Sequence, residues 1–203
     1  MKEFTEKYTQ SGVLTGKLLD HYFNSVRELT QLSNINDIKD AEILEIGCGS
    51  AFSTERLLEF LPNDANINAS DIEIENVEDA NRRVGSSVKV IKEDVYSLIR
   101  EDTSVNLTFV LEVLEHLKNP EKALSEIRRI CNGFVILGVP REPIWRILNM
   151  VRGKYLRNFG NTPGHLQHWS AHGFKKFLED NGFVVVAIRL PLPWAIALVK
   201  KRN

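Results

Sequence analysis

The 203-residue sequence predicts an α/β fold: a doubly wound, mostly parallel seven-stranded sheet with helices on both faces and an antiparallel last strand. Three observations support this fold. Short apolar runs alternate with segments of helical periodicity, which is typical of parallel strands joined by helices. Residues 134–139 form an apolar run of the kind found in strands buried on both faces. The last two strands are separated only by residues 190–193, and so short a connection favours an antiparallel hairpin.

The N-terminal half begins with a predicted amphipathic helix over residues 13–32. Its apolar side chains recur at helical spacing at Leu14, Leu18, Tyr22, Val26 and Leu29. Short apolar runs then predict strands at residues 42–46, 66–70, 88–91 and 105–111. Between these strands we expect a helix over residues 52–61, which Pro62 would end, and another helix that ends near Gly85.

The helix after residues 105–111 has the clearest boundary signals. Asn119 can cap its N-terminus, and Pro120 suits its first turn. Leu124, Ile127 and Cys131 would share one face, and Asn132-Gly133 is expected to end the helix.

The remaining elements follow the predicted strand at residues 134–139. We expect an irregular stretch over residues 140–169, then a helix over residues 171–180 that Ser170 caps. The last two strands are predicted at residues 183–189 and 194–200.

Composition predicts an ordinary globular protein with a single domain over residues 1–203. Hydrophobic residues make up 43% and charged residues 26%. The formal net charge of −1 provides no overall attraction to nucleic acid, so we do not expect nucleic-acid binding. Residues 1–8 lack the apolar core of a secretory signal, and two cysteines make no disulfide framework. These features predict a cytoplasmic protein.

The strongest motif is Ile43-Leu44-Glu45-Ile46-Gly47-Cys48-Gly49-Ser50-Ala51, which runs from a predicted strand through a glycine turn into a helix. Glycines allow the backbone to bend sharply and to approach a ligand closely. Doubly wound sheets bind ligands at the carboxyl ends of their strands, which is where this turn lies. The carboxylate of Glu45 suits a cationic ligand and would repel the pyrophosphate of a dinucleotide.

Acidic residues follow the next two predicted strands. Asp71 ends the second strand, where a carboxylate can accept hydrogen bonds from both hydroxyls of a ribose. Asp94-Val95 follows the third strand, where a side chain and the next backbone N–H could bind the edge of an adenine. Either residue alone would also suit a helix cap or a surface turn. Asp71, Asp94 and the turn at Gly47 all lie at the carboxyl ends of predicted strands, and together with Glu45 they favour a nucleoside site.

With these motifs together, the chain resembles the class I S-adenosylmethionine-dependent methyltransferases. It resembles the broad small-molecule subgroup in which the fourth strand runs into a segment such as Leu111-Glu112-Val113-Leu114-Glu115-His116-Leu117, and the similarity spans roughly residues 42–186. The resemblance implies S-adenosylmethionine as cofactor and S-adenosylhomocysteine as product. The cofactor-binding residues that it implies are Glu45, Gly47, Cys48, Gly49, Asp71, Ile72, Asp94, Val95, Leu111 and Glu112. Ala51 stands where many members carry a third glycine, and we expect this change to be tolerated.

The acceptor chemistry is less specified. A hydroxyl acceptor would need a base, for which His116 and His165 are the candidates and His168 is an alternative. The ubiquinone-pathway O-methyltransferases and the small-RNA 2′-O-methyltransferases hold a divalent ion with a similar Glu-x-x-Glu-His segment and a later histidine. By that resemblance Glu112, Glu115, His116 and the later His165 could hold a metal, although the sequence does not favour a metal over a metal-free site.

Residues 141–157 combine apolar side chains with basic ones, and Glu142 is the only acidic residue among them. The segment follows the fifth strand, where the family usually builds a lid over the acceptor. Its first interpretation is a lid helix packed on its own domain with a solvated basic side. The alternative is a surface for a lipid, an anionic acceptor or peripheral contact with a membrane.

The expected function is methyl transfer to a small-molecule or lipid-like acceptor. Two alternatives stay open. A nicotinamide-dependent oxidoreductase would use the same turn, but Phe52 stands where the usual GxGxxG motif has its last glycine. A non-catalytic module that binds S-adenosylmethionine is also consistent with the motifs, because they specify the cofactor site better than a base. The identity of the acceptor and the oligomeric state do not follow from the sequence.

Overall fold

The computed structural model describes residues 13–202, so the charged stretch at residues 1–8 lies outside the described residues. The strands are β1 Glu42–Ile46, β2 Asn66–Asp71, β3 Lys89–Lys92, β4 Val105–Leu111, β5 Cys131–Pro140, β6 Phe183–Arg189 and β7 Trp194–Lys201. They form one seven-stranded sheet in the order β3-β2-β1-β4-β5-β7-β6. All adjacent pairs from β3 to β5 are parallel, and β7 is antiparallel to both β5 and β6. The predicted fold class, including its antiparallel last strand, is confirmed.

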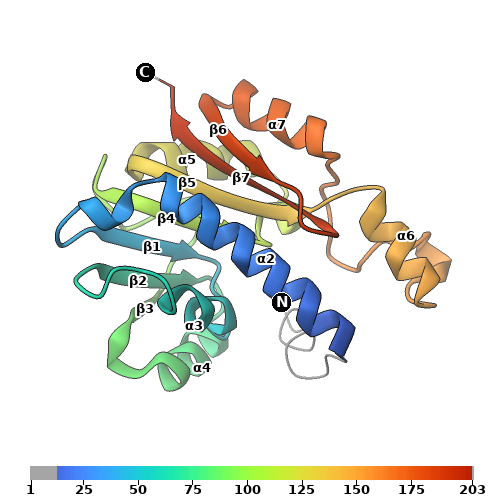
Figure 1. Cartoon of the computed structure of the whole chain (residues 1–203), viewed down its shortest axis with the longest axis horizontal. Helices are drawn as coiled ribbons and strands as arrows, with labels where there is room; N and C mark the ends of the chain where they lie inside the picture. Colours follow the sequence, from blue (N-terminus) through green and yellow to red (C-terminus); the bar gives the residue numbers. More distant parts are fainter. Residues whose placement is uncertain (1–12, 203) are drawn as a thin grey trace.

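Helices cover both faces of this sheet (Figure 1). The α-helices are α2 Val13–Leu32, α3 Phe52–Leu58, α4 Ile74–Val84, α5 Pro120–Ile130, α6 Ile144–Val151 and α7 Ala171–Asp180, and the short 3₁₀ helices are η1 Ile35–Asp37, η2 Gly85–Ser87, η3 Leu114–His116 and η4 Leu156–Asn158. Helices α2 and α3 pack on one face of the sheet, and α4 lies over β2 and β3. Helices α5 and α7 pack on the opposite face. Helix α6 stands to one side, beyond the end of β5 (Figure 1).

The core explains why these elements form. On one face, Val26 and Leu29 of α2 are fully buried against a sheet surface that includes Phe109. On the other face, Leu124 of α5 and Phe174 of α7 are fully buried. Each such side chain is stabilised by about 1.5–3 kcal/mol relative to leaving it in water. The helical spacing noted in the sequence therefore marks the faces that are removed from solvent.

The predicted end of helix α5 at Asn132-Gly133 and the predicted start of the next strand at residue 134 are both wrong. The helix ends at Ile130, and residues 131–133 belong to β5 instead of closing the helix. The physical reason is tertiary: Cys131 pairs with Val105 of β4 and is fully buried. Gly133 fits closely against the backbone carbonyl of Asn106, where a Cβ atom would clash. Packing against β4 thus overrides the local stop signal of Asn132-Gly133.

Other differences are local. Asn119 precedes α5 but makes no side-chain capping bond among the described residues; its own N–H donates to the Tyr96 hydroxyl. Helix α3 ends at Leu58, before the predicted Leu61, because Pro62 disfavours helical backbone in the residue that precedes it. The stretch predicted to be irregular contains α6 and η4. The predicted cap of α7 is present, since the Ser170 hydroxyl accepts a hydrogen bond from the Gly173 N–H.

Within residues 13–202, no helix has both the length and the apolar character that crossing a membrane would need.

Candidate functional site

The glycine turn lies at the carboxyl end of β1, beside the point where the strand order reverses between β1 and β4. The N–H groups of Gly47 and Cys48 both donate to the Ser70 carbonyl on β2, at 2.7 and 2.9 Å. Gly47 has a φ of +74°, in the region that favours glycine. Ala51, the residue in place of a third glycine, has a φ of +63° and is fully buried. The structure therefore places an alanine in a backbone conformation that glycine would adopt with less strain.

Glu45 is buried beneath this turn. One of its carboxylate oxygens accepts a hydrogen bond of 2.6 Å from the Thr54 hydroxyl of α3. Burial raises the pKa of Glu45, the hydroxyls of Ser53 and Thr54 act in the opposite direction, and the negative charge of Asp71 raises it further. The carboxylate thus ties β1 to α3 as well as placing negative charge under the turn. Burial, followed by the charges of Glu45 and Asp71, also raises the pKa of the Cys48 thiol.

Asp71 joins the turn to the end of β2. One carboxylate oxygen accepts from the Gly49 N–H at 2.9 Å, and the other accepts from the Glu73 N–H at 2.9 Å and the Asn76 side chain at 3.0 Å. Each carboxylate oxygen can accept about two hydrogen bonds, so Asp71 can hold the turn and still accept from a ligand. Sequence reasoning missed Asn76, because a single amide in the first turn of a helix gives no pattern that marks it.

Replacing Asp71 by alanine should weaken the binding of S-adenosylhomocysteine by about 1–3 kcal/mol, because the groups that donate to this carboxylate would lose their acceptor. Titration calorimetry measures the change. The control is Asp64→Ala, which alters an exposed aspartate between α3 and β2. If a folded Asp71→Ala protein bound the ligand as tightly as the control, Asp71 would have no part in the site.

The residues expected near an adenine lie at the ends of β2 and β3. Ile72 is 46% exposed, which leaves an apolar side chain in solvent next to Asp71. Asp94 accepts a hydrogen bond from the Tyr96 N–H, and Val95 is buried in the core. The neighbouring Glu93 stabilises the fold, since its buried carboxylate forms an ion pair with Arg100 at 3.3 Å.

The end of β4 borders the glycine turn. Leu111 is buried, and Glu112 has a φ of +59°, an uncommon conformation for a residue other than glycine. The Glu112 N–H donates to the Gly138 carbonyl of β5 at 2.9 Å, which fixes this bend. Such backbone strain costs about 1–3 kcal/mol and occurs most often at functional sites. A Cβ atom at Gly47 would lie 2.5 Å from the Val113 side chain, so the two strand ends are in close contact.

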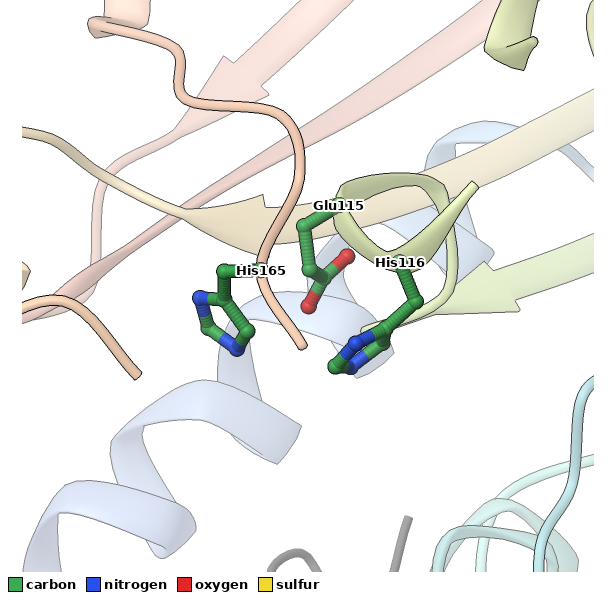
Figure 2. A group of neighbouring side chains, drawn as sticks. All are labelled: Glu115, His116 and His165. Carbon is green, nitrogen blue, oxygen red and sulfur yellow. The ribbon is translucent and has the colours of Figure 1, made fainter. Parts of the chain in front are cut away.

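Glu115, His116 and His165 form one cluster beyond β4. One potential ligand atom from each lies within 4.8 Å of the others, and Glu115 and His165 are buried. Figure 2 shows the Glu115 carboxylate directed between the two imidazole rings, whose centroids are 5.0 Å apart. The backbone holds this arrangement, because the N–H groups of Leu166 and Gln167 both donate to the Glu115 carbonyl. Glu112 is not a member of this cluster of potential ligands.

The cluster allows two kinds of chemistry. An imidazole beside a carboxylate can act as a general base. Two imidazoles and one carboxylate also make a ligand set that suits Zn²⁺ or Mn²⁺ better than Mg²⁺, which prefers oxygen. His168 lies elsewhere: it bonds the Asn161 side chain at 2.7 Å, and burial followed by the charge of Arg146 lowers its pKa.

Helix α6 adjoins the cluster through Trp145, whose ring centroid is 5.8 Å from that of His165. Trp145 is buried and donates to the Thr162 hydroxyl at 3.0 Å, and Asn149 donates to the Gly160 carbonyl at 2.9 Å. These contacts fix one side of α6 on the domain. No sequence pattern marks Asn149 or Thr162, since their partners are determined by the loop that follows α6.

Comparison with known proteins shows the fold and a match to a methyltransferase domain over part of the chain. Residues 44–136 match the family described as a methyltransferase domain. Magnesium protoporphyrin IX methyltransferase from Synechocystis PCC 6803, solved with bound S-adenosylhomocysteine, is 16% identical, with a TM-score of 0.71 over 100% of this chain and 94% of that one. An S-adenosylmethionine-dependent methyltransferase from Aquifex aeolicus is 17% identical, with a TM-score of 0.67 over 85% and 87% of the two chains.

Two further relatives broaden the comparison. A chain in the complex between the Haloferax volcanii Trm112 methyltransferase activator and a methyltransferase described as putative is 13% identical, with a TM-score of 0.71 over 93% of each chain. An uncharacterised 37.1 kDa protein of transposon TN4556 from Streptomyces fradiae is 31% identical over 111 residues. This match covers 53% of the chain and 31% of the relative, so the chain spans about a third of the length of that protein.

The family match covers β1 to β4, the strands whose ends carry the glycine turn, Asp71, Asp94 and Glu112. The two solved structures share this fold over 85% and 100% of the chain. The chain therefore has the fold of the S-adenosylmethionine-dependent methyltransferases, and residues 44–136 match a methyltransferase domain.

Proposed function

We propose that the protein transfers the methyl group of S-adenosylmethionine to a small, lipid-like acceptor. One observation carries the cofactor part of this proposal. The carboxyl ends of four adjacent parallel strands, β3, β2, β1 and β4, bring the predicted cofactor residues to one edge of the sheet. The Gly49 N–H bonds Asp71, and the Glu93 N–H bonds the Asp71 carbonyl, so these strand ends are also linked to one another.

Each proposed cofactor residue has a role that follows from its place. The methionine end of the cofactor would lie over residues 45–49, and the Asp71 oxygen that accepts only from the Gly49 N–H would also accept from a ribose hydroxyl. Ile72, Asp94 and Val95 would surround the adenine, and the bend after Leu111 would border the methyl group. The sulfonium makes this methyl electrophilic, so the main task of the protein is to hold an acceptor in line and to exclude water.

The acceptor part of the proposal rests on the cluster and on α6. His116 and His165 lie beside a buried carboxylate, which suits removal of a proton from an acceptor hydroxyl. Residues 141–157 follow β5, whose carboxyl end borders the same region. Their apolar and basic character favours an acceptor with a long apolar part, reached by peripheral contact with a membrane.

The two alternatives have less support. A nicotinamide-dependent oxidoreductase would place a pyrophosphate next to the buried Glu45, and the family match is to a methyltransferase domain. A non-catalytic module would need no histidine pair beside the cofactor edge.

The test is methyl transfer in fractionated cell extract with S-adenosylmethionine labelled in its methyl group. We expect label to enter the organic-soluble fraction, and Gly47→Val protein serves as the control without cofactor binding. Label that appears only in protein or in nucleic acid would contradict the lipid-like acceptor while leaving methyl transfer intact. Tight binding of NAD with no binding of S-adenosylhomocysteine would contradict the methyltransferase itself.

A further inference from the structure

The outer side of α6 and the turn after it expose large apolar side chains, which we call the α6 face. Its residues and exposed fractions are Ile147 48%, Met150 36%, Val151 78%, Leu156 59% and Phe159 78%. Single exposed apolar residues are ordinary, but contiguous groups of them mark interaction surfaces. Within 13 residues of chain, this segment places five such side chains in solvent.

The charges around the α6 face have one sign. Arg152, Lys154 and Arg157 are all exposed among these apolar residues. Residues 143–178 contain no aspartate or glutamate, although the whole chain has more acidic than basic residues. Arg146 is the exception among the basic residues, because Glu142 pairs with it at 3.4 Å. The positive charge of the face is therefore not balanced within its own segment.

The orientation of α6 is fixed by its opposite side. Trp145 is buried and bonds Thr162, while Asn149 bonds both Gly160 and Thr162. Ile147, Met150 and Val151 follow one another at helical spacing on the side away from these bonds. Turning the apolar side inward would break these buried hydrogen bonds. The interpretation of the segment as a lid that buries its own apolar side thus fits Trp145 but not the α6 face.

We infer that the α6 face docks on an anionic lipid bilayer, with its apolar side chains in the interface and its basic side chains at the headgroups. An interfacial helix of this kind combines an apolar side with lysine and arginine. Each basic residue near an anionic surface adds to the attraction. The inference deepens the proposed function, because Trp145 links the docked helix to His165 and would place a lipid-like acceptor beside the cluster.

A protein partner is the competing occupant. Arginine is common in protein interfaces, so the preference for the bilayer rests on Lys154, a residue type depleted there, and on the absence of acidic residues from residues 143–178. On the α6 face the three basic residues alternate with the apolar ones along the chain from Val151 to Arg157.

The experiment is co-sedimentation of the full-length protein with vesicles of phosphatidylcholine alone and with phosphatidylglycerol added. The test variant is Arg152→Glu/Lys154→Glu/Arg157→Glu. The matched control is Lys39→Glu/Lys89→Glu/Lys122→Glu, which makes the same change in charge at three exposed lysines elsewhere. A second variant, Val151→Asp/Phe159→Asp, removes apolar contact, and 0.5 M NaCl should screen the electrostatic attraction.

We expect the protein to bind anionic vesicles at low salt, and the test variant to bind them at least about 100-fold more weakly than the control. High salt and the second variant should also weaken binding. Absence of binding at low salt, equal loss in the control, or equal binding to uncharged vesicles would overturn the inference, and a protein partner would then be sought for the face. Binding of S-adenosylhomocysteine is measured in every variant and should not change, so a failure to dock is distinguished from a failure of the cofactor site.

Discussion

Gly47→Val should abolish cofactor binding, with affinity for S-adenosylhomocysteine reduced by more than about 100-fold. Gly47 has a φ of +74°, where a β-branched residue is strained by about 1–3 kcal/mol. Its new Cβ atom would also lie 2.5 Å from the Val113 side chain, and overpacking of this kind costs about 1–3 kcal/mol more. The backbone strain and the steric clash both distort the glycine turn, over which the cofactor should bind. Titration calorimetry with S-adenosylhomocysteine measures the loss.

A matched control separates the clash from the backbone strain. Gly153 has a φ of +70°, but a Cβ atom there would meet nothing within 4 Å. Gly153→Val therefore carries similar strain far from the glycine turn and should bind the ligand normally. Circular dichroism should show that both variants are folded. If Gly47→Val kept the affinity of Gly153→Val, the turn would be a structural feature only.

This prediction also shows what the sequence could not supply. The glycine turn itself was predictable, because a strand, two glycines and a helix occur in order. The sequence indicated that a side chain at Gly47 would block the path of the ligand. The structure adds that the side chain would first meet Val113, from a segment 66 residues further along the chain. No local pattern contains that contact.

The fold was largely predictable for a physical reason. In each strand and helix, apolar residues recur at the spacing of the side that is buried. A short stretch of sequence is therefore enough to predict the element. The predicted boundaries are wrong where contact with a residue distant in the sequence determines the backbone conformation. Cys131 and Gly133 follow a helix and a stop signal, yet pairing with β4 makes them part of a strand. A lid helix was anticipated within residues 141–157, but its bounds were not, and its inner side is fixed by Thr162 and Gly160 of the loop that follows it.

The cluster of Glu115, His116 and His165 was only partly predictable. The sequence named its members as candidates, but 49 residues separate His116 from His165, and nothing in the sequence required them to meet. The structure brings them together because Leu166 and Gln167 bond the Glu115 carbonyl, and His116 lies 3.0 Å from the Gly164 carbonyl. His168 is not a member of this cluster, and its ring bonds the Asn161 side chain instead.

His165→Ala and His116→Ala should each lower turnover by about 10²–10⁴-fold, the usual contribution of a positioned proton-transfer group. The cluster adjoins the bend after β4 and lies apart from Asp71 and Asp94, so the affinity for S-adenosylhomocysteine should stay unchanged. His172→Ala alters an exposed histidine at the start of α7 and is the control. Turnover is measured by label transfer to the acceptor fraction. Full activity in both cluster variants would place the base elsewhere.

Chelation separates the two chemical roles of the same residues. If His116 or His165 acts as a base alone, metal-free protein should turn over normally in EDTA, and Glu115→Gln should lower the rate by weakening the orientation of the imidazoles. If the cluster holds a divalent cation, EDTA should abolish turnover, and Mn²⁺ or Zn²⁺ should restore it better than Mg²⁺, because two of the three ligands are imidazoles. Glu115→Gln and His165→Ala would then resemble the chelated protein, and metal content measured by mass spectrometry would fall with activity. Cofactor affinity should persist in both cases, because the glycine turn, Asp71 and Asp94 lie at the ends of β1, β2 and β3, whereas the cluster follows β4.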